Sequence, residues 1–501
     1  MKGTSCISAA LALATCAYSC SMAHAEETKP LSVMQAIERA MAGNADLRRE
    51  RVAVAQAKAR ETAAEGKFDF LLDAALGMKR EVSLPLSCTP PCRDLSLDKT
   101  TTTTVGLGLS RSLESGGILR LAGSASRAAS DAPADPAALP GTFYTSSLAL
   151  YFSHPLLRGF GTEVTLANLR KARIQQDITQ MGRQMRACNV IRDVVVAYWE
   201  LAYATQDLAI KRSALELAEE QLRTTKALIG VGRLADSDAA SVERAIAQRL
   251  EDVATGEQNH YFRSLDLQRL FGVPADVNLP LFAAADTPTT GVPSLDVAAE
   301  VSRALEANPQ LRALKLGLRL SQADVATARS TLRPRLDFTG SVGPVGWKPG
   351  LGDSVKQMAG FGSLAWSAGL AFELPVENRA ARGQMRAAEE DLNLAKLNAE
   401  DFAVQLRDLV LRTTRSIRTA GERVALGRRE VEFAEQNLDA ERARFQAGRA
   451  TNNDVLLRQQ ELKDAETRLL RATVDENESE VTLSAATAEV LDYYGVVLKG
   501  F

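Results

Sequence analysis

The sequence is poor in the residues on which catalysis, metal binding and nucleic-acid binding depend. It has only three histidines, His24, His154 and His260, which stand far apart along 501 residues. No Ser/His/Asp arrangement and no metal-ligand spacing accompanies them, so we predict that the protein is not an enzyme and uses no cofactor or metal. The formal net charge of −2 excludes the strongly basic surface that nucleic-acid binding requires.

Long hydrophobic runs and aromatic residues are also scarce. Beyond the N-terminus no segment reaches the roughly 18 consecutive apolar residues of a transmembrane helix. Entry into a membrane would therefore require strands that close into a barrel. Aromatic residues make up 5% of the chain. Alanine, leucine, arginine, glutamate and glutamine dominate instead, which is the composition of long helices.

Residues 1–25 have the features of a secretory signal peptide. Lys2 supplies the positive start, residues 7–17 form a short apolar run, and Ala23-His24-Ala25 is a small-x-small cleavage site. Alternatively, Leu13-Ala14-Thr15-Cys16 resembles a lipobox, in which case Cys16 would carry a lipid, although threonine fits that motif poorly. Either route takes the protein out of the cytoplasm.

Three cysteines follow this segment. Cys88 and Cys92 flank Thr89-Pro90-Pro91 in a loop-like stretch, and in an oxidising compartment we expect a local disulfide. Free thiols and a metal site are the alternatives, although no second cysteine or histidine pair supports a metal. Cys188 lies in a helical stretch, where we expect an inert, buried thiol.

The chain contains an internal duplication. Gly232-Arg233 and Gly448-Arg449 each follow a similar helical sequence, and their offset is 448 − 232 = 216 residues. Two ladders of apolar residues with a spacing of seven keep the same offset: Val194, Leu201, Leu208, Leu215, Leu222, Ile229 and Val410, Ile417, Val424, Val431, Leu438, Phe445. This spacing is the signature of a left-handed coiled coil.

The beginnings of the two halves also match, because Asn44 and Asn308 occupy similar segments. We predict a signal peptide (1–25), a first repeat (26–272), a proline-rich linker (273–295) and a second repeat (296–501). Each repeat should hold one long helix, at about 163–229 and about 380–446, each about 100 Å long. Shorter helices are expected at about 31–64, 237–270, 296–331 and 453–487, each near half that length, so that two placed end to end match one long helix in an antiparallel pillar.

Apolar and polar residues alternate in several short segments. The apolar members of four of them share one face each: Phe68, Phe70, Leu72, Ala74, Leu76, Met78; Tyr144, Leu148, Leu150, Phe152; Leu336, Phe338, Val342; and Trp366, Leu370, Phe372, Leu374. This pattern is typical of transmembrane barrel strands, and a soluble sheet with one buried face is the alternative. Four strands cannot close a barrel, so the barrel would be shared between subunits.

The chain resembles the TolC-like family of outer-membrane efflux channels over essentially all of its mature length. The resemblance rests on Phe152–Gly161, Ala197–Leu201, the turns Gly232–Asp238 and Gly448–Leu456, and Asn308–Leu311 followed by Pro334-Arg335-Leu336. It implies a mainly α fold with a β-barrel portion: a periplasmic helical tube of duplicated coiled-coil hairpins, and a transmembrane barrel. It also implies a homotrimer in which each subunit contributes four strands to a shared twelve-stranded barrel.

One region departs from the family pattern. Residues 101–113 and 118–127, joined by Glu114-Ser115-Gly116-Gly117, look like an additional hairpin in the first half. It lies near Cys88 and Cys92, and it puts the expected number of strands in doubt.

The functional candidates lie at the two hairpin turns. Asp236, Asp238, Asn452, Asn453 and Asp454 are candidates for the periplasmic tip or gate, because a ring of carboxylates in a symmetric pore favours cations. Helix capping is the plainer interpretation, and Asp236, Ser237, Thr451 and Asn452 all suit it; a capping residue can also serve in a gate. Gly232, Arg233, Gly448 and Arg449 form the turns, at which the resemblance places docking of a periplasmic adaptor protein.

We therefore expect the exit duct of a tripartite efflux or type I secretion system in the outer membrane, extending into the periplasm. Its expected partners are two further copies of itself, a periplasmic adaptor, an inner-membrane pump and outer-membrane lipid. The alternative is a periplasmic coiled-coil spacer or tether, which would not need the alternating strands.

Overall fold

The computed structural model describes residues 29–83, 98–130, 141–274, 281–288, 290–291 and 295–498. The signal segment with Cys16, and the pair Cys88 and Cys92, lie outside these residues. The described chain forms two compact units. The first comprises residues up to 42, 194–290 and 420–478, and the second comprises residues 43–193, 291–419 and from 479 onward.

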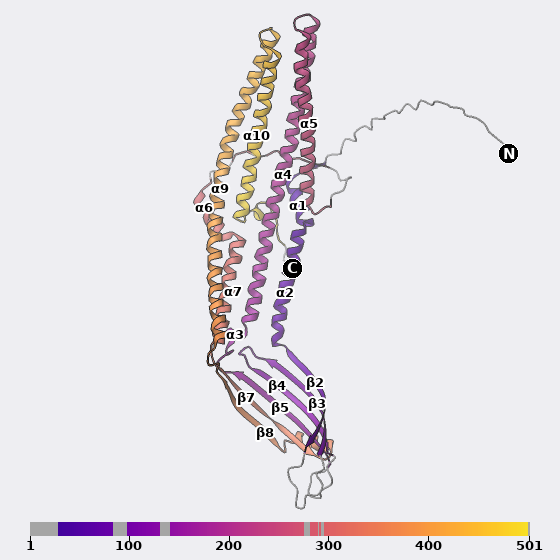
Figure 1. The fold of residues 1–501 in the computed structure, drawn as a ribbon, viewed down its shortest axis with the longest axis vertical. Helices are drawn as coiled ribbons and strands as arrows, with labels where there is room; N and C mark the ends of the chain where they lie inside the picture. The colour runs from indigo at the N-terminus through magenta and orange to yellow at the C-terminus, as the bar shows by residue number, and fades with distance from the viewer. Residues whose placement is uncertain are drawn as a thin grey trace, which may run out of the picture. The chain divides into compact units, whose positions relative to one another are not determined.

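Two very long helices run through the chain (Figure 1). Helix α4 spans Ala167–Gly230 and α9 spans Arg379–Gln446, close to the predicted bounds. Each is followed by a turn and a 35-residue helix, α5 (Asp236–Leu270) and α10 (Asn452–Ala486). Both ends of α10 keep the 216-residue offset from α5. The predicted ladders form much of the helix cores, since Val194, Leu201, Val410 and Ile417 are all buried.

The other two predicted helices are each divided at an asparagine. One gives α1 (Val33–Gly43) and α2 (Ala45–Glu65), and the other gives α6 (Val297–Ala307) and α7 (Pro309–Thr331). Asn44 Oδ1 accepts hydrogen bonds from Asp46 N and Leu47 N, and Asn308 Oδ1 accepts from Gln310 N and Leu311 N. Each asparagine is thus an N-cap that starts a new helix, a local feature that heptad spacing does not reveal.

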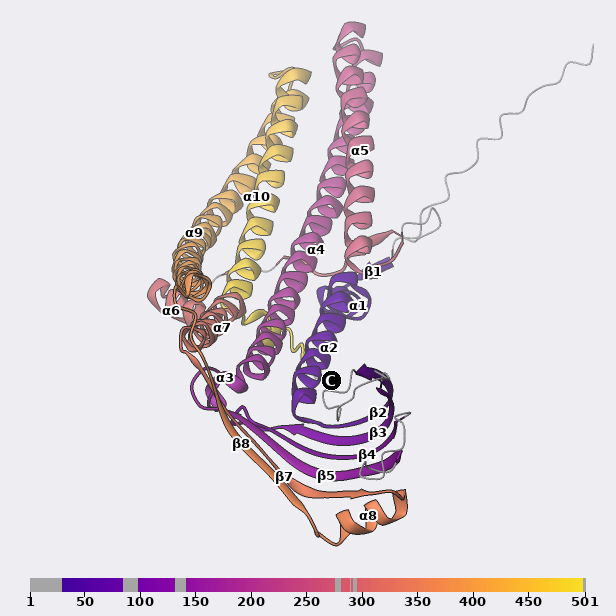
Figure 2. The same ribbon diagram turned by 60° about the horizontal axis from the view of Figure 1, so that its bottom comes forward.

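Six strands form one antiparallel sheet in the second unit (Figure 2). Its order is β2 (Phe70–Ser83), β3 (Asp98–Ser112), β4 (Ile118–Ser130), β5 (Thr142–Pro155), β7 (Arg335–Lys348) and β8 (Leu364–Glu373). The expected count of four strands is therefore wrong. The additional hairpin is not an appendage: all but the last residue of β3 pair with β2, and all but the last residue of β4 pair with β5.

The two faces of this sheet differ in chemistry. The register aligns Leu72, Leu109, Leu121, Leu150, Val342 and Trp366 in one row across all six strands. On this face Leu72 is 73% exposed, Leu76 79% and Trp366 74%. The opposite face carries mainly small and polar residues, with Leu71, Ile118 and Tyr151 as larger exceptions. Hydrogen bonds on this face join Ser124 to Ser147 and Ser341 to Ser367.

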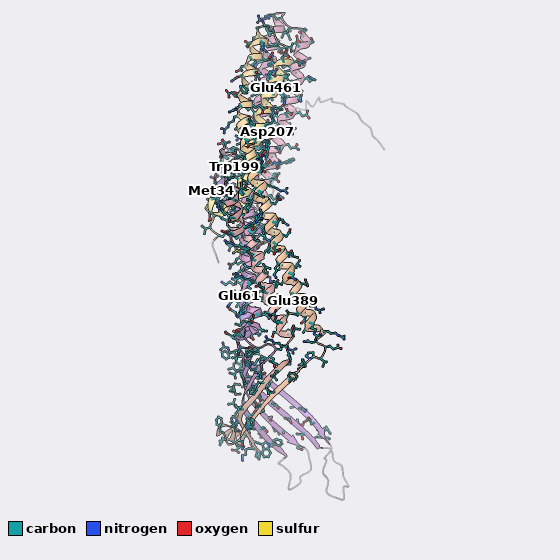
Figure 3. The ribbon with its side chains drawn as sticks, turned by 90° about the vertical axis from the view of Figure 1, so that its left-hand side faces the viewer. Met34, Glu61, Trp199, Asp207, Glu389 and Glu461 are labelled. Atoms are coloured by element: carbon teal, nitrogen blue, oxygen red, sulfur yellow. The ribbon has the colours of Figure 1, made fainter. Side chains whose placement is uncertain are left out.

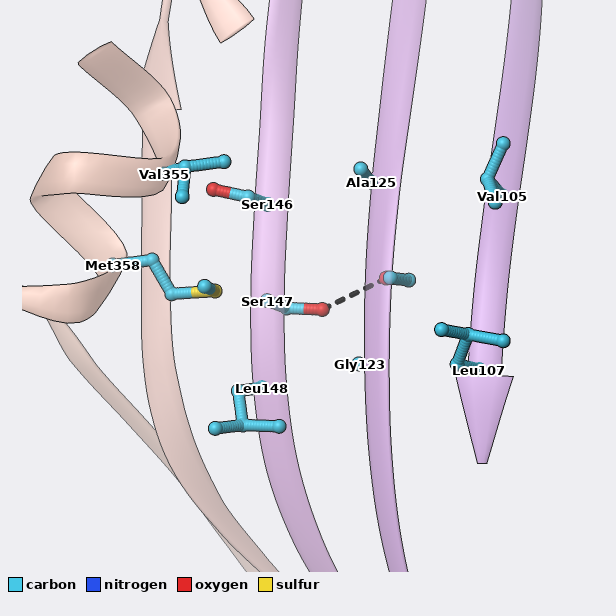
Figure 4. A pocket seen from close by; sticks show the side chains of 10 residues that line it. Val105, Leu107, Gly123, Ala125, Ser146, Ser147, Leu148, Val355 and Met358 are labelled. Carbon is cyan, nitrogen blue, oxygen red and sulfur yellow. Dashed lines mark hydrogen bonds between the residues drawn. The ribbon is translucent and has the colours of Figure 1, made fainter. Parts of the chain in front are cut away.

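A short helix, α8 (Leu351–Ala359), follows β7 and folds onto the apolar face against β5 and β7. Ser354 Oγ donates to Gly346 O at 3.0 Å and lies 2.8 Å from Ser146 Oγ. A side chain at Gly346 would meet the backbone of Ser354, so this approach requires glycine. Figure 4 shows Val355 and Met358 beside Ser146 and Leu148, bordering an apolar groove.

Three short helical segments complete the second unit: η1 (Gly66–Phe68), α3 (Thr162–Thr165) and α11 (Val490–Tyr493). Cys188 on α4 is buried and free, as predicted, and burial raises the pKa of its thiol to about 11. The thiolate is the reactive form of cysteine, so this thiol is unreactive at neutral pH.

In the first unit, β1 (Lys29–Leu31) pairs in parallel with β6 (Phe282–Ala284), a strand within the segment predicted as a linker. The fully buried Tyr198 of α4 fixes this pair, because its hydroxyl is 3.0 Å from Leu31 O and 2.9 Å from Asp286 Oδ2. The adjacent Trp199 is labelled in Figure 3. No helix among the described residues is both long enough and apolar enough to cross a membrane.

Candidate functional site at the helical hairpin turns

The two hairpin turns have the same backbone geometry. Gly232 and Gly448 have φ values of 70° and 75°, a region that favours glycine. In the first turn Gly232 N donates to Ile229 O and Arg233 N donates to Leu228 O; in the second, Gly448 N donates to Phe445 O and Arg449 N to Arg444 O. Each pair of bonds is a Schellman motif, which ends the long helix and reverses the chain.

Two of the predicted carboxylates cap the helices that follow the turns. Asp454 Oδ2 accepts from Thr451 N at 2.8 Å and from Thr451 Oγ1 at 2.7 Å. These hydrogen bonds from Thr451 lower the pKa of Asp454. Asp238 Oδ2 accepts from Ala235 N at 3.0 Å in the equivalent position of α5. The capping interpretation therefore describes the geometry of Asp238 and Asp454, whereas their part in a gate stays a prediction.

Asn452 joins the two hairpins to each other. Its side chain is only 6% exposed, and its Oδ1 atom lies 2.8 Å from Gln221 Nε2 and 2.9 Å from Thr225 Oγ1, both on α4. Its amide donates to Asp238 O at 3.4 Å. Sequence reasoning selected Asn452 for the tip but missed Gln221 and Thr225. In the sequence, only one feature could have pointed to Gln221 and Thr225: they are polar residues that lie among the apolar ladder residues of α4.

A small apolar cluster supports the same end of the hairpins. Leu438, Phe445 and Val455 are buried, and Leu228 and Leu234 of the first hairpin pack against them. Arg233 also reaches the second turn, because its Nη2 atom lies 3.4 Å from the position that a Cβ on Gly448 would take. The structure thus brings the two turns together in the first unit.

The remaining predicted residues face solvent at these turns. Asp236, the first residue of α5, is exposed, and so are Asn453 and the turn residue Arg449. Asp238 and Asp454 are engaged in capping, so Asp236 is the predicted tip carboxylate that is most available to ions or to another protein. Its role remains a prediction.

A second polar cluster, which sequence reasoning did not single out, lies farther along the helices of the first unit. Arg471 of α10 forms ion pairs with Glu200 (2.7 Å), Asp475 (2.6 Å) and Glu478 (2.9 Å). Burial, reinforced by the charge of Glu200 and opposed by Arg471, raises the pKa of Glu478 to about 7. This Arg471 cluster therefore holds a carboxyl group that titrates near neutral pH.

The comparisons with known proteins agree with the features of the sheet and the hairpins. A family model described as outer membrane efflux protein matches residues 301–489. Nodulation protein T of Rhizobium leguminosarum bv. trifolii is 24% identical over 322 residues, which cover 61% of this chain and 64% of that protein. The chain thus spans slightly less than two thirds of this relative's length.

A second relative is the outer membrane efflux protein BepC of Brucella suis biovar 1, 23% identical over 341 residues, covering 67% of this chain and 71% of that protein. Among solved structures, the outer-membrane channel OprN superposes with a TM-score of 0.67 at 17% identity, covering 91% of this chain and 89% of that one. VceC from Vibrio cholerae gives 0.65 at 16% identity, with coverage of 91% and 96%.

Proposed function

We propose that this chain, a member of the TolC-like outer-membrane efflux protein family located in the outer membrane and extending into the periplasm, is one subunit of a passive exit duct. In this proposal three copies close a common barrel and a common helical tube. Exported compounds would reach the tube from an inner-membrane pump through a periplasmic adaptor, as in tripartite efflux or type I secretion.

The observation that carries the proposal is the chemistry of the six-stranded sheet. One face exposes large apolar side chains, including Leu72, Leu76 and Trp366, whereas the other carries serine, threonine, glycine and the Asp73–Arg120 ion pair. Such an apolar surface is costly in water and suits the lipid side of a barrel, and the polar face suits an aqueous lumen. A periplasmic tether would need neither face.

An oligomer follows from the edges of the sheet. Among the described residues, β2 and β8 each have a partner on one side only. In lipid the free side of each strand would leave backbone groups without hydrogen bonds, which is costly. Pairing of β2 from one subunit with β8 of the next removes both edges, and a ring of subunits closes the barrel.

The hairpin turns are the proposed site of regulation and docking. Gly232, Arg233, Gly448 and Arg449 form two similar surfaces per subunit, and we assign adaptor docking to them. Asp236 would be repeated around the symmetry axis, where its exposed carboxylate attracts cations.

The test is single-channel conductance of the detergent-extracted protein in a planar bilayer. We expect discrete steps with a preference for cations, and a weaker preference in Asp236→Asn combined with Asp238→Asn. Glu389→Gln is the control, since it removes one carboxylate from an exposed position on α9 (Figure 3). Unchanged selectivity in the double variant would reject the aspartate ring. A protein that stays soluble without detergent and gives no conductance would reject the duct and favour the tether.

A further inference from the structure

The β3–β4 hairpin enlarges the sheet without disturbing its pattern. Strand β2 pairs with β3 from Phe70 opposite Arg111 to Ser83 opposite Asp98, and β4 pairs with β5 from Ile118 opposite Ser153 to Ala129 opposite Thr142. The hairpin is therefore hydrogen-bonded into the wall on both sides. It lies between the strands that would otherwise be neighbours, β2 and β5.

The hairpin also keeps the two faces of the sheet in phase. The register places Leu72, Leu109, Leu121 and Leu150 side by side, so the apolar face runs from β2 to β5 without interruption. An ion pair of 2.7 Å between Asp73 of β2 and Arg120 of β4 crosses β3 on the polar face. Two extra strands preserve both the alternation of faces and the antiparallel order, whereas a single extra strand would reverse the order.

We propose that the β3–β4 hairpin makes the shared barrel eighteen-stranded, and thereby widens the outer-membrane exit for bulky hydrophilic solutes. The proposal rests on the proposed function, because it assumes that three copies close one barrel. A subunit contributes six strands, and an even number lets β8 of one copy meet β2 of the next in antiparallel order. Four strands per subunit would give twelve.

The expected widening follows from strand geometry. With strands about 4.8 Å apart and tilted by about 40°, eighteen strands give a barrel about 36 Å across, against about 24 Å for twelve. Barrels of 16 to 18 strands leave an aqueous channel, whereas much smaller ones are filled by side chains.

The polar face supports an open lumen of this width. On the six strands most of its residues are small, among them Gly106, Ser124, Ser147, Ser341 and Gly369. Few side chains are therefore long enough to narrow the opening. Hydroxyl groups together with the Asp73–Arg120 pair make the wall hydrophilic, so the barrel would not retain bulky polar cargo, and selection by size would be exerted elsewhere in the duct.

The test compares the full-length oligomer with a shortened one. Replacing residues 84–138 by Asn-Gly joins β2 to β5 through a two-residue hairpin turn. The existing register then sets Leu72 opposite Leu150, with both side chains on the apolar face. The shortened protein also carries Asp73→Asn, because its ion-pair partner is deleted. Full-length protein with Asp73→Asn and Arg120→Gln is the matched control, since it loses the ion pair and keeps six strands.

Electron-microscopic averages of the detergent-extracted oligomers give the barrel diameter, and exclusion of polyethylene glycols added on the barrel side gives the width of the opening. We expect three-fold oligomers, with a barrel about 1.5 times wider in the full-length protein and the control than in the shortened one. Larger glycols should enter only the two wider pores.

Equal diameters, or a full-length barrel near 24 Å with two-fold symmetry, would overturn the proposal while leaving a conducting duct in place. Absence of any oligomer or conductance would instead refute the proposed function itself. If the shortened protein does not fold, the diameter of the full-length barrel still decides between eighteen and twelve strands.

Discussion

The guanidinium of Arg120 on β4 forms an ion pair with the carboxylate of Asp73 on β2, two strands away, at 2.7 Å. The strand between them passes beneath the pair at Gly108. A Cβ at that position would lie 2.7 Å from both Arg120 Nη2 and Asp73 Oδ1. The absence of a side chain at Gly108 is therefore what allows the two strands to be linked on the polar face.

Substitution Gly108→Ala should break this link. The added methyl group would displace both charged side chains, and the cost should be about 1 kcal/mol or less because such half-exposed pairs are weak. Gly77→Ala on β2 is the control, since a Cβ there has no heavy atom within 4 Å. We expect the Gly108 variant alone to dissociate at lower temperature, as followed by loss of the oligomer band in detergent gels. If both variants lost the oligomer band at the same lowered temperature, the change in β propensity at the substituted strand position, and not the ion pair, would explain the destabilisation.

Asn452→Leu should destabilise the contact between the hairpins. It removes the acceptor of the buried Gln221 side-chain amide, which would be left unpaired at a cost of about 1–3 kcal/mol, whereas the Thr225 hydroxyl can still donate to Gln221 O. Asn453→Leu, one residue farther along and exposed, should have little effect. Hydrogen exchange of the first turn of α10 is the measurement. Protection that is unchanged in the Asn452 variant would show that the apolar cluster around Phe445 alone holds the hairpins together.

Much of the helical architecture could be predicted because it depends on a repeated local pattern. The spacing of Leu201, Leu208 and their counterparts located α4 and α9 closely, and the glycines of the turns marked their ends. The breaks at Asn44 and Asn308 were missed, since one capping side chain changes the backbone without changing the apolar period. The alternating segments located β2, β5, β7 and β8, but the count of four strands drawn from them, which the family resemblance also implied, was wrong.

The site was predicted less completely. Gly232, Gly448, Asp238 and Asp454 act within a few residues of sequence, so their turn and capping chemistry is visible in the sequence. Asn452 and Thr225 are separated by more than 200 residues along the chain, and Arg471 and Glu200 by still more. Such contacts depend on how two helices are rotated about their axes relative to each other, and this rotation cannot be inferred from a single sequence.

Asp454→Asn should remove an acid-sensitive cap. Hydrogen bonds from Thr451 hold the folded pKa of Asp454 below its ordinary value, so its contribution is present above that ordinary value and is lost as pH falls through the folded pKa. Protection from exchange at the start of α10, taken relative to the intrinsic exchange rate at each pH, should therefore decrease in acid in the native protein. In Asp454→Asn this protection should be low and nearly independent of pH across the same range. A native profile that stays flat down to strongly acid pH would contradict this.

The Arg471 cluster should give the opposite pH dependence. Because the pKa of Glu478 is raised to about 7, the folded chain keeps a proton that the unfolded chain loses above about pH 4.3. Stability from this group should fall as pH rises through that window, by an amount on the order of 3 kcal/mol. Glu478→Gln should remove the slope, whereas Glu430→Gln, in an exposed pair with Arg468, should not. Parallel melting curves against pH for Glu478→Gln and the native protein would refute the assignment.

The 216-residue offset predicts how neighbouring subunits meet at the tips. Within one chain, Asn452 contacts Gln221 and Thr225. In the internal repeat, the residue equivalent to Asn452 is Asp236, and the residues equivalent to Gln221 and Thr225 are Asn437 and Glu441. The equivalent contact would therefore pair Asp236 with Asn437 and Glu441. Since α5 and α10 have equal lengths and equivalent bounds, we expect the subunit boundary to repeat the contact made within one chain, with Asp236 of one copy facing Glu441 of the next. Two carboxylates would then oppose each other there, which loosens that boundary at neutral pH relative to the one joined by Asn452.

Disulfide cross-linking measures this directly. Asp236→Cys combined with Glu441→Cys should give covalent dimers and trimers on oxidation, and each single variant should give none. Asp236→Cys with Glu430→Cys is the matched control, because residue 430 lies about three turns before residue 441 on α9, farther from the tip and beyond the reach of a disulfide there. Cross-links in the control but not in the predicted pair would mean that the contact at the subunit boundary does not follow the internal repeat.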